Sequence, residues 1–212
     1  MKTKSEEVFE SFLTLNNIPF QKIEEVKEKA SYRPDYLLEF GDLRLVVEVK
    51  ELAEDDNFGV VKDPLRPDIR SYSGTPGDHV RKRIRGSKKQ IQYGANQGIP
   101  SILLIYNNID PVFQRFGTED FDFKTAMYGE LTLLIDRNTR ETSDFFQGRN
   151  NELQESKNTS FGAVGRLADR GGKQTVTLFE NVYSKVKVPY ELLPACFEVI
   201  RVEMSKEPLS FA

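Results

Sequence analysis

Segment 33–52, RPDYLLEFGDLRLVVEVKEL, constrains the fold more than any other part of the sequence. It contains two runs of strand-forming residues, 35–40 and 43–50, separated only by Gly41 and Asp42. A connection this short joins neighbouring strands as an antiparallel hairpin. The segment therefore predicts a hairpin inside a β-sheet, with charged residues gathered at one end of it.

The second run of this hairpin carries two charges among apolar residues. Side chains alternate between the two faces of a strand, so Glu48 and Lys50 are expected to share one face. Val47 and Val49 are expected to share the other. Asp35 opens the partner strand, and antiparallel pairing brings the start of one strand close to the end of the other. Two carboxylates and one amine are thus expected to converge.

The remaining pattern predicts a mixed α/β chain. Helices are expected at 5–17, 79–98 and 119–129, and further strands at 18–26, 99–107, 131–137, 160–167, 174–181 and 197–204. Ser5 is the expected N-cap of the first helix. The apolar run 99–107 predicts a buried strand parallel to a neighbour, and 131–137 predicts another buried strand. Segments 51–78 and 138–160 are polar and are expected to be loops.

Composition limits the class of protein. A chain of 212 residues suits one domain. Its longest apolar run, IPSILLIY, is far shorter than the roughly 20 residues that span a bilayer, and the first ten residues lack the apolar stretch of a signal peptide. The one cysteine, Cys196, excludes an internal disulfide and a Cys-rich zinc site within one chain. These features predict a cytoplasmic protein without a membrane segment.

The sequence also disfavours several enzyme classes. His79 is the one histidine and begins a predicted helix, where it is better explained as a helix-start residue than as a general base. The lack of other histidines argues against His-based zinc hydrolases and Ser-His-Asp catalysis. No GK[ST] phosphate loop is present, which argues against ATP hydrolysis.

The converging charges suit phosphate chemistry. Carboxylates such as Asp35 and Glu48 are ligands that Mg²⁺ prefers, together with phosphate oxygens. The metal polarises a phosphoryl oxygen and lowers the pKa of a bound water. Lys50 would orient that water or stabilise charge that develops on the phosphate. The alternative is a solvated strand face with paired charges, in which the Asp after Pro34 forms a turn.

The dipeptide Pro34-Asp35, followed after a hairpin by Glu48-Val49-Lys50, resembles the signature of the PD-(D/E)xK nuclease superfamily. The resemblance implies a restriction-endonuclease-like core, an α/β fold with a mixed central β-sheet flanked by helices in the order αβββαβ. It assigns the core to residues 5–107 of a single domain 1–212, with 108–212 as extra C-terminal β elements.

The resemblance also implies an activity and roles for particular residues. The expected activity is Mg²⁺-dependent hydrolysis of phosphodiester bonds in DNA, by an endo- or exodeoxyribonuclease in which Mn²⁺ can substitute. Asp35 and Glu48 correspond to the metal-binding acids and Lys50 to the catalytic lysine. A homodimer is the assembly implied for cutting two strands. The alternative is a non-cleaving nucleic-acid-binding or protein-interaction module with the same fold.

Two further catalytic candidates follow from the same resemblance. Glu6, on the first helix, corresponds to an acid aimed at the metal, and Glu10 could take that place; alternatively, acids there only complement the helix dipole. Gln90 corresponds to a Gln or basic residue on the helix after the lysine strand. One branch of relatives carries a Tyr four residues later, where this chain has Gly94 and its Tyr93 lies one place short.

A cluster of cations follows His79. Six basic residues and no acid occur between 80 and 90, and they are Arg81, Lys82, Arg83, Arg85, Lys88 and Lys89. Because the net charge of the chain is -3, nucleic-acid contact requires a local basic patch of this kind. The run therefore predicts contacts with a phosphate backbone, without sequence readout. The alternative is a solubilising surface partly paired with the acids at 54–56.

Overall fold

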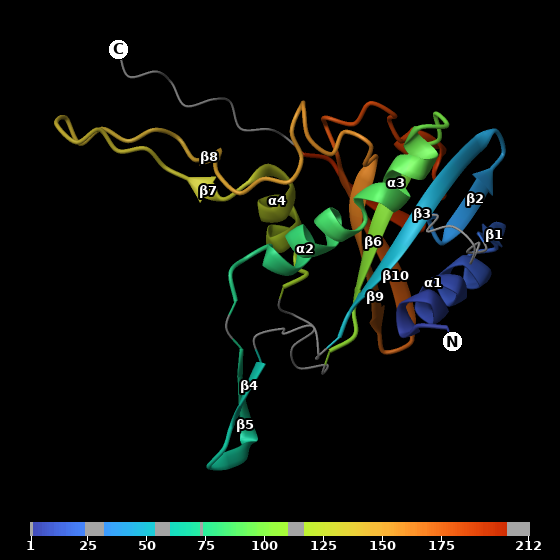
Figure 1. Ribbon diagram of the computed structural model, residues 1–212, viewed down its shortest axis with the longest axis horizontal. Helices are drawn as coiled ribbons and strands as arrows, with labels where there is room; N and C mark the ends of the chain where they lie inside the picture. Colours follow the sequence, from blue (N-terminus) through green and yellow to red (C-terminus); the bar gives the residue numbers. More distant parts are fainter. Residues whose placement is uncertain (1, 24–31, 54–59, 73, 110–116, 203–212) are drawn as a thin grey trace.

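The structure is a computed structural model that describes residues 2–23, 32–53, 60–72, 74–109 and 117–202 (Figure 1). The acids at 54–56 and the ends of the strands expected at 18–26 and 197–204 lie outside these ranges.

A seven-stranded mixed sheet forms the centre of the molecule, in the order β1-β2-β3-β6-β9-β10-β11 (Figure 1). Its strands are β1 (Phe20–Lys22), β2 (Tyr36–Phe40), β3 (Leu43–Leu52), β6 (Ser101–Asn107), β9 (Ala163–Arg170), β10 (Lys173–Glu180) and β11 (Phe197–Ile200). β3, β6 and β9 run parallel, whereas β1–β2, β2–β3 and β9–β10 are antiparallel. The mixed α/β class is confirmed, and the C-terminal strands extend the same sheet.

The hairpin of β2 and β3 forms as predicted. Tyr36 pairs with Val47 and Phe40 pairs with Leu43. Gly41 occupies the turn with φ of 58°, a left-handed conformation that glycine adopts without steric cost. The long apolar β3 is therefore anchored beside its partner from the turn onward.

Helices cover both faces of the sheet. They are α1 (Lys4–Leu15), α2 (Asp78–Gly86), α3 (Lys88–Ala95) and α4 (Asp120–Tyr128). Phe9 and Phe12 of α1 belong to a core with Val47 on one face, and Ile84 of α2 belongs to a core with Phe123 of α4 on the other. The expected helix 119–129 is confirmed. No helix in the described ranges has the length and apolar character needed to cross a bilayer.

The first helix begins earlier than expected. Its N-cap is Thr3, not Ser5, because Thr3 and Glu6 form a capping box in which each side chain accepts a backbone N–H of the other residue. Ser5 is instead buried inside the helix, and its N–H donates to Glu51 of β3. This hydrogen bond ties α1 to the sheet.

The prediction of a single helix at 79–98 is wrong. The chain forms α2 and then α3, with Ser87 between them at φ of -97° and ψ of 1°. Gly86 and Ser87 are both weaker helix formers than their neighbours, so the break falls at them.

Two segments outside the central sheet also differ from expectation. The expected loop 51–78 contains β4 (Val60–Asp63) and β5 (Arg66–Tyr72), an antiparallel hairpin that projects from the body in Figure 1. Pro64 lies in the turn of this hairpin, and Pro67 is the second residue of β5.

The prediction of a buried strand at 131–137 is wrong as well. Only β7 (Leu131–Thr132) forms, paired with β8 (Phe146–Gln147) in a projecting two-stranded arm (Figure 1). Ile135 is 63% exposed. The apolar run is not buried because the arm lies away from the central sheet and its helices.

Candidate functional site

Asp35 lies at the start of β2, beside the carboxyl-terminal half of β3. The last pair of this ladder is Tyr36 with Val47, so the next position along places Asp35 opposite Glu48. Asp35 Oδ2 accepts the backbone N–H of Val49 at 2.8 Å, and its carbonyl accepts the N–H of Ile23 at 2.9 Å. Asp35 is therefore held from both sides, by β3 and by the end of β1.

Glu48 is a buried acid with one oxygen that lacks an N–H donor. Its side chain is 1% exposed, and its Oε1 lies 2.5 Å from the Nζ of Lys50, which is 32% exposed. Its Oε2 is buried and meets no N–H donor among the described residues, whereas a protonated Glu48 hydrogen-bonds to the Asp35 carboxylate. A buried acceptor without a partner costs about 1–3 kcal/mol, and more when charged. Burial of the Glu48 carboxyl group therefore costs stability, and Lys50 is the member of this ion pair that reaches solvent.

Both acids have raised pKa values. Burial and the neighbouring Asp35 carboxylate together raise the pKa of Glu48 to about 8, against the opposing effect of Lys50. Burial also raises the pKa of Asp35, although the Val49 N–H and the Lys50 charge act in the other direction. Two carboxylates with raised pKa and a shared amine are typical of functional sites.

Helix α3 lies over this part of β3. An added Cβ at Gly94 would lie 2.9 Å from Val46 Cγ2, so the helix backbone passes close above Val46. The chain returns from the end of β3 to the start of the parallel β6, so α3 runs opposite to β3. Gln90 lies one helical turn before Gly94, about 6 Å along α3 in the direction of the end of β3. Gln90 Oε1 is also buried without a partner.

Glu6 is engaged elsewhere. Its Oε1 lies 2.6 Å from the Nζ of Lys22, and its Oε2 accepts the Thr3 N–H at 2.7 Å. Burial opposes the change, but the bonds to Lys22 and Thr3 lower the pKa of Glu6. Its charge is near enough to raise the pKa of Asp35. The structure thus places Glu6 next to the site with both oxygens already bound.

Glu10 is occupied in the same way. It forms an ion pair of 2.5 Å with Lys2 and accepts the hydroxyl of Tyr36 at 2.9 Å. Among the residues that the structure describes, no group of three or more His, Cys, Asp or Glu side chains is arranged to hold a metal ion. The carboxylates that do converge are those of Asp35 and Glu48.

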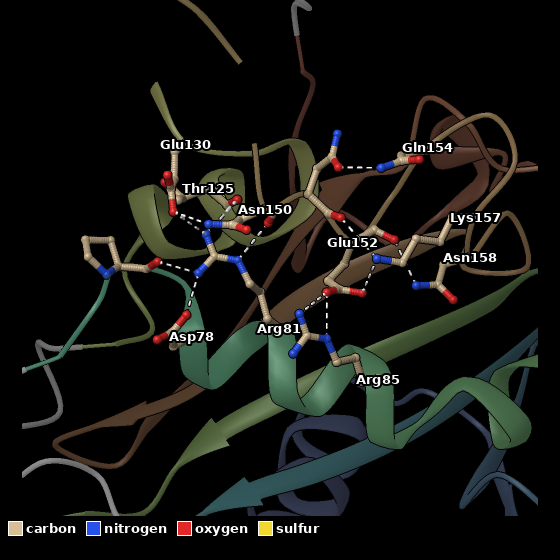
Figure 2. A network of polar contacts seen from close by, with 12 residues as sticks. Asp78, Arg81, Arg85, Thr125, Glu130, Asn150, Glu152, Gln154, Lys157 and Asn158 are labelled. Carbon is tan, nitrogen blue, oxygen red and sulfur yellow. Dashed lines mark hydrogen bonds and ion pairs between the residues drawn. The ribbon is translucent and has the colours of Figure 1, made fainter. Parts of the chain in front are cut away.

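The six predicted phosphate-binding cations divide into different environments. Arg81 is buried, and its guanidinium donates to the carbonyls of Pro76 and Asn150 and to Asp78 (Figure 2). It therefore joins α2 to neighbouring segments and does not belong to the exposed surface. Arg83 is half-buried. The exposed members are Lys82, Arg85, Lys88 and Lys89.

Two of the exposed cations have local partners. Arg85 Nε donates to Oε1 of the buried Glu152 at 2.7 Å (Figure 2). Lys89 Nζ lies 3.9 Å from the centre of the Tyr32 ring, near Asp35 in the sequence. Sequence reasoning missed Glu152, which lies in the polar segment 138–160, and Lys22, which lies at the end of β1, because only tertiary contacts distinguish them from other charged residues.

His79 is the second residue of α2, and burial lowers its pKa.

A scan against protein-family models and searches of curated proteins and of solved structures find no match to this chain.

Proposed function

We propose that the protein is a metal-dependent nuclease of the PD-(D/E)xK type that hydrolyses phosphodiester bonds, with DNA as its substrate. One observation carries the proposal: the buried carboxyl group of Glu48, whose Oε2 meets no N–H donor, lies at the point where Asp35 and Lys50 also meet. Burying one carboxyl group beside a second carboxylate costs free energy, and a purely structural strand would gain nothing in return.

The donor set fits a divalent cation. Mg²⁺ commonly uses one or two carboxylates and completes its shell with water and phosphate oxygens, so two converging acids suffice. A cation between Asp35 and Glu48 would stabilise the ionised forms that burial disfavours in both acids, and would offset the repulsion that Asp35 exerts on Glu48. When bound, Mg²⁺ polarises a phosphoryl oxygen and lowers the pKa of water. Glu6, bound to Lys22 and Thr3, would act on the site only through its charge.

The protein's own groups have distinct tasks in this proposal. Asp35 is oriented by the Val49 N–H, and Glu48 is oriented by Lys50. The exposed part of Lys50 lies where a phosphate would approach, and its ammonium would stabilise negative charge that develops in the transition state. Gln90 would bind water or a phosphate oxygen through its amide.

The arrangement of elements supports the same proposal. The order α1-β1-β2-β3, then α2 and α3, then β6 matches the order αβββαβ expected for a restriction-endonuclease-like core. The β4–β5 hairpin is an insertion between β3 and α2. The strands β9, β10 and β11 then extend the sheet beyond β6.

A cleavage assay tests the proposal. Linear duplex, circular duplex and single-stranded DNA would be incubated with the protein in Mg²⁺, in Mn²⁺ and in EDTA. We expect metal-dependent cleavage that falls about 100-fold or more in Asp35→Asn, Glu48→Gln and Lys50→Ala. Asp144→Asn is the matched control, because Asp144 is an exposed acid between β7 and β8, outside the central sheet.

Two outcomes would contradict a nuclease. Equal cleavage by wild type and all three site variants would indicate a contaminating enzyme. No cleavage under any condition would favour the non-cleaving binding module. Calorimetric titration of Mn²⁺ into wild type and Asp35→Asn adds a readout independent of activity, and only the wild type should bind the ion.

A further inference from the structure

A cavity lies on the same face of the sheet as the two acids. Its volume is about 420 Å³, and its apolar floor includes Leu37, Val46 and Ile99. Tyr93 of α3 lines one side, and Arg33 and Arg44 line the strand side. The space exists because α3 packs on β3 and β6 and leaves β1 and β2 beside it (Figure 1).

The cavity leads to the candidate site. Leu37 of β2 pairs with Val46 of β3, so the two side chains share one face. Two residues further along this face, about 7 Å away, are Asp35 and Glu48. A chain of nucleotides that leaves the cavity along β2 would therefore reach the half-buried Asp35, which lies opposite the buried Glu48.

The lining has the composition of a polynucleotide groove. It includes the cations Arg33 and Arg44, and no carboxylate belongs to its described lining. Lys22 borders the cavity as well, but its ammonium binds Glu6 of α1 on the opposite, Tyr36 face of the sheet. Arg44 lies 3.9 Å from Glu39, and its side chain is 54% exposed. Cations that follow a backbone and an aromatic ring on which a base stacks are the recurring parts of single-strand binding sites. The Tyr93 ring is 36% exposed and available for such stacking.

The size of the cavity favours a single strand over a duplex as its ligand. Its volume is within the range of about 300–1,000 Å³ that is typical of small-ligand pockets. That space suits one or two nucleotides, whereas a paired duplex would lie across the opening. The apolar floor also suits the face of an unpaired base better than a phosphate backbone.

Resting on the nuclease proposal, we infer that this cavity binds an unpaired segment of the substrate, a single-stranded polynucleotide, and directs its backbone to Asp35 and Glu48. Tyr93 stacks on a base, and Arg33 and Arg44 contact phosphates. The preferred substrate is thus a single strand, a frayed end or a flap.

Fluorescence anisotropy tests the inference without cleavage. The full chain in EDTA would be titrated into labelled eight-nucleotide DNA, the same RNA sequence and a blunt duplex, at one salt concentration. We expect tighter binding to a single strand than to the duplex, and the DNA and RNA arms identify the sugar preferred. Tyr93→Ala and Arg44→Ala should each weaken single-strand binding about fivefold or more. Tyr93→Phe keeps the ring and should retain binding.

Arg137→Ala is the charge-matched control, because Arg137 is exposed between β7 and β8, away from the cavity (Figure 1). The inference is overturned if Tyr93→Ala and Arg44→Ala bind like the wild type, if the duplex binds as tightly as the single strand, or if neither binds. A protein that binds single strands here but never cuts would refute the nuclease proposal alone. A protein that cuts a duplex without needing Tyr93 or Arg44 would refute the cavity assignment alone.

Discussion

The Asp35 carboxylate is bound to the strand that carries its two partners. Its Oδ2 accepts the backbone N–H of Val49 at 2.8 Å, and Val49 lies between Glu48 and Lys50 in β3. Because the donor is backbone, substitutions at positions 48 and 50 leave this hydrogen bond in place. Glu48 and Lys50 can therefore be substituted without releasing the Asp35 carboxylate from β3.

The coupling between the two acids can be measured directly. Asp35→Asn removes a negative charge beside Glu48 and should lower the pKa of Glu48 below its value of about 8. Lys50→Ala removes the opposing positive charge and should raise it. Carboxyl NMR titration of both variants checks the two directions. A Glu48 pKa that is the same in both variants would contradict the arrangement.

The raised pKa of Glu48 predicts how stability changes with pH. Its ordinary value is 4.5, and its folded value is about 8, so the folded state holds a proton that the unfolded state has released between these values. The free energy of unfolding should therefore fall as pH rises from 4.5 to 8, by at most about 1.4 kcal/mol per pH unit from this group. Urea unfolding across this range measures it.

Glu48→Gln is the control for this pH dependence. Glutamine does not titrate, so the slope between pH 4.5 and 8 should become smaller than in the wild type, with the part due to Asp35 left. Mg²⁺ should stabilise the wild type most at pH 8, where the acids are most readily ionised. An unchanged slope in Glu48→Gln would show that Glu48 is already ionised in the acid range.

The close packing of α3 on β3 predicts a sharp difference between two glycines. A Cβ at Gly94 would lie 2.3 Å from Ser101 Oγ and 2.9 Å from Val46 Cγ2. Gly94→Ala should therefore lower the free energy of unfolding by about 1–3 kcal/mol. Gly86→Ala meets no atom within 4 Å and should stabilise α2 by up to about 1 kcal/mol. Similar effects for the two would contradict this packing.

The buried Glu152 predicts an asymmetric response to mutation. It is 1% exposed and lies 2.6 Å from Arg85 and 2.9 Å from Lys157, which reach it from the surface (Figure 2). The double variant Arg85→Ala/Lys157→Ala leaves a buried charge unpaired and should cost about 3–5 kcal/mol. Glu152→Gln should cost less, because both cations can return to water. Denaturant midpoints compare the two, and an equal cost would argue against the buried charge.

Substitutions of the exposed cations should change DNA binding, whereas substitution of the buried Arg81 should change the free energy of unfolding. If Lys82 and Lys88 contact phosphates, the variant Lys82→Ala/Lys88→Ala should reduce the slope of log binding constant against log salt by about 0.9 per contact on duplex DNA, with an unchanged melting temperature. Arg81→Ala should instead cost about 2 kcal/mol or more, because it leaves buried carbonyls unpaired. A salt slope that does not change would make these lysines a solubilising surface.

Local pattern was sufficient for the central elements. The hairpin of β2 and β3, the buried parallel β6 and the shared face of Glu48 and Lys50 all follow from alternation and from one short turn. The sequence pattern predicted burial less well where contacts with distant segments decide it. The segment carrying Ile135 has the sequence of a buried strand, yet it forms an arm whose strand β7 pairs only with β8, and Ile135 is 63% exposed.

The sequence by itself determined that Asp35, Glu48 and Lys50 come to one end of a hairpin, because pairing and alternation are local properties of neighbouring strands. Only the tertiary structure decided that Glu48 is buried, that Glu6 is bound to Lys22, and that Arg81 lies inside. Burial and ion pairing depend on which distant segments pack together, as α3 does on β3 through Gly94. Residue spacing along the chain does not encode those contacts.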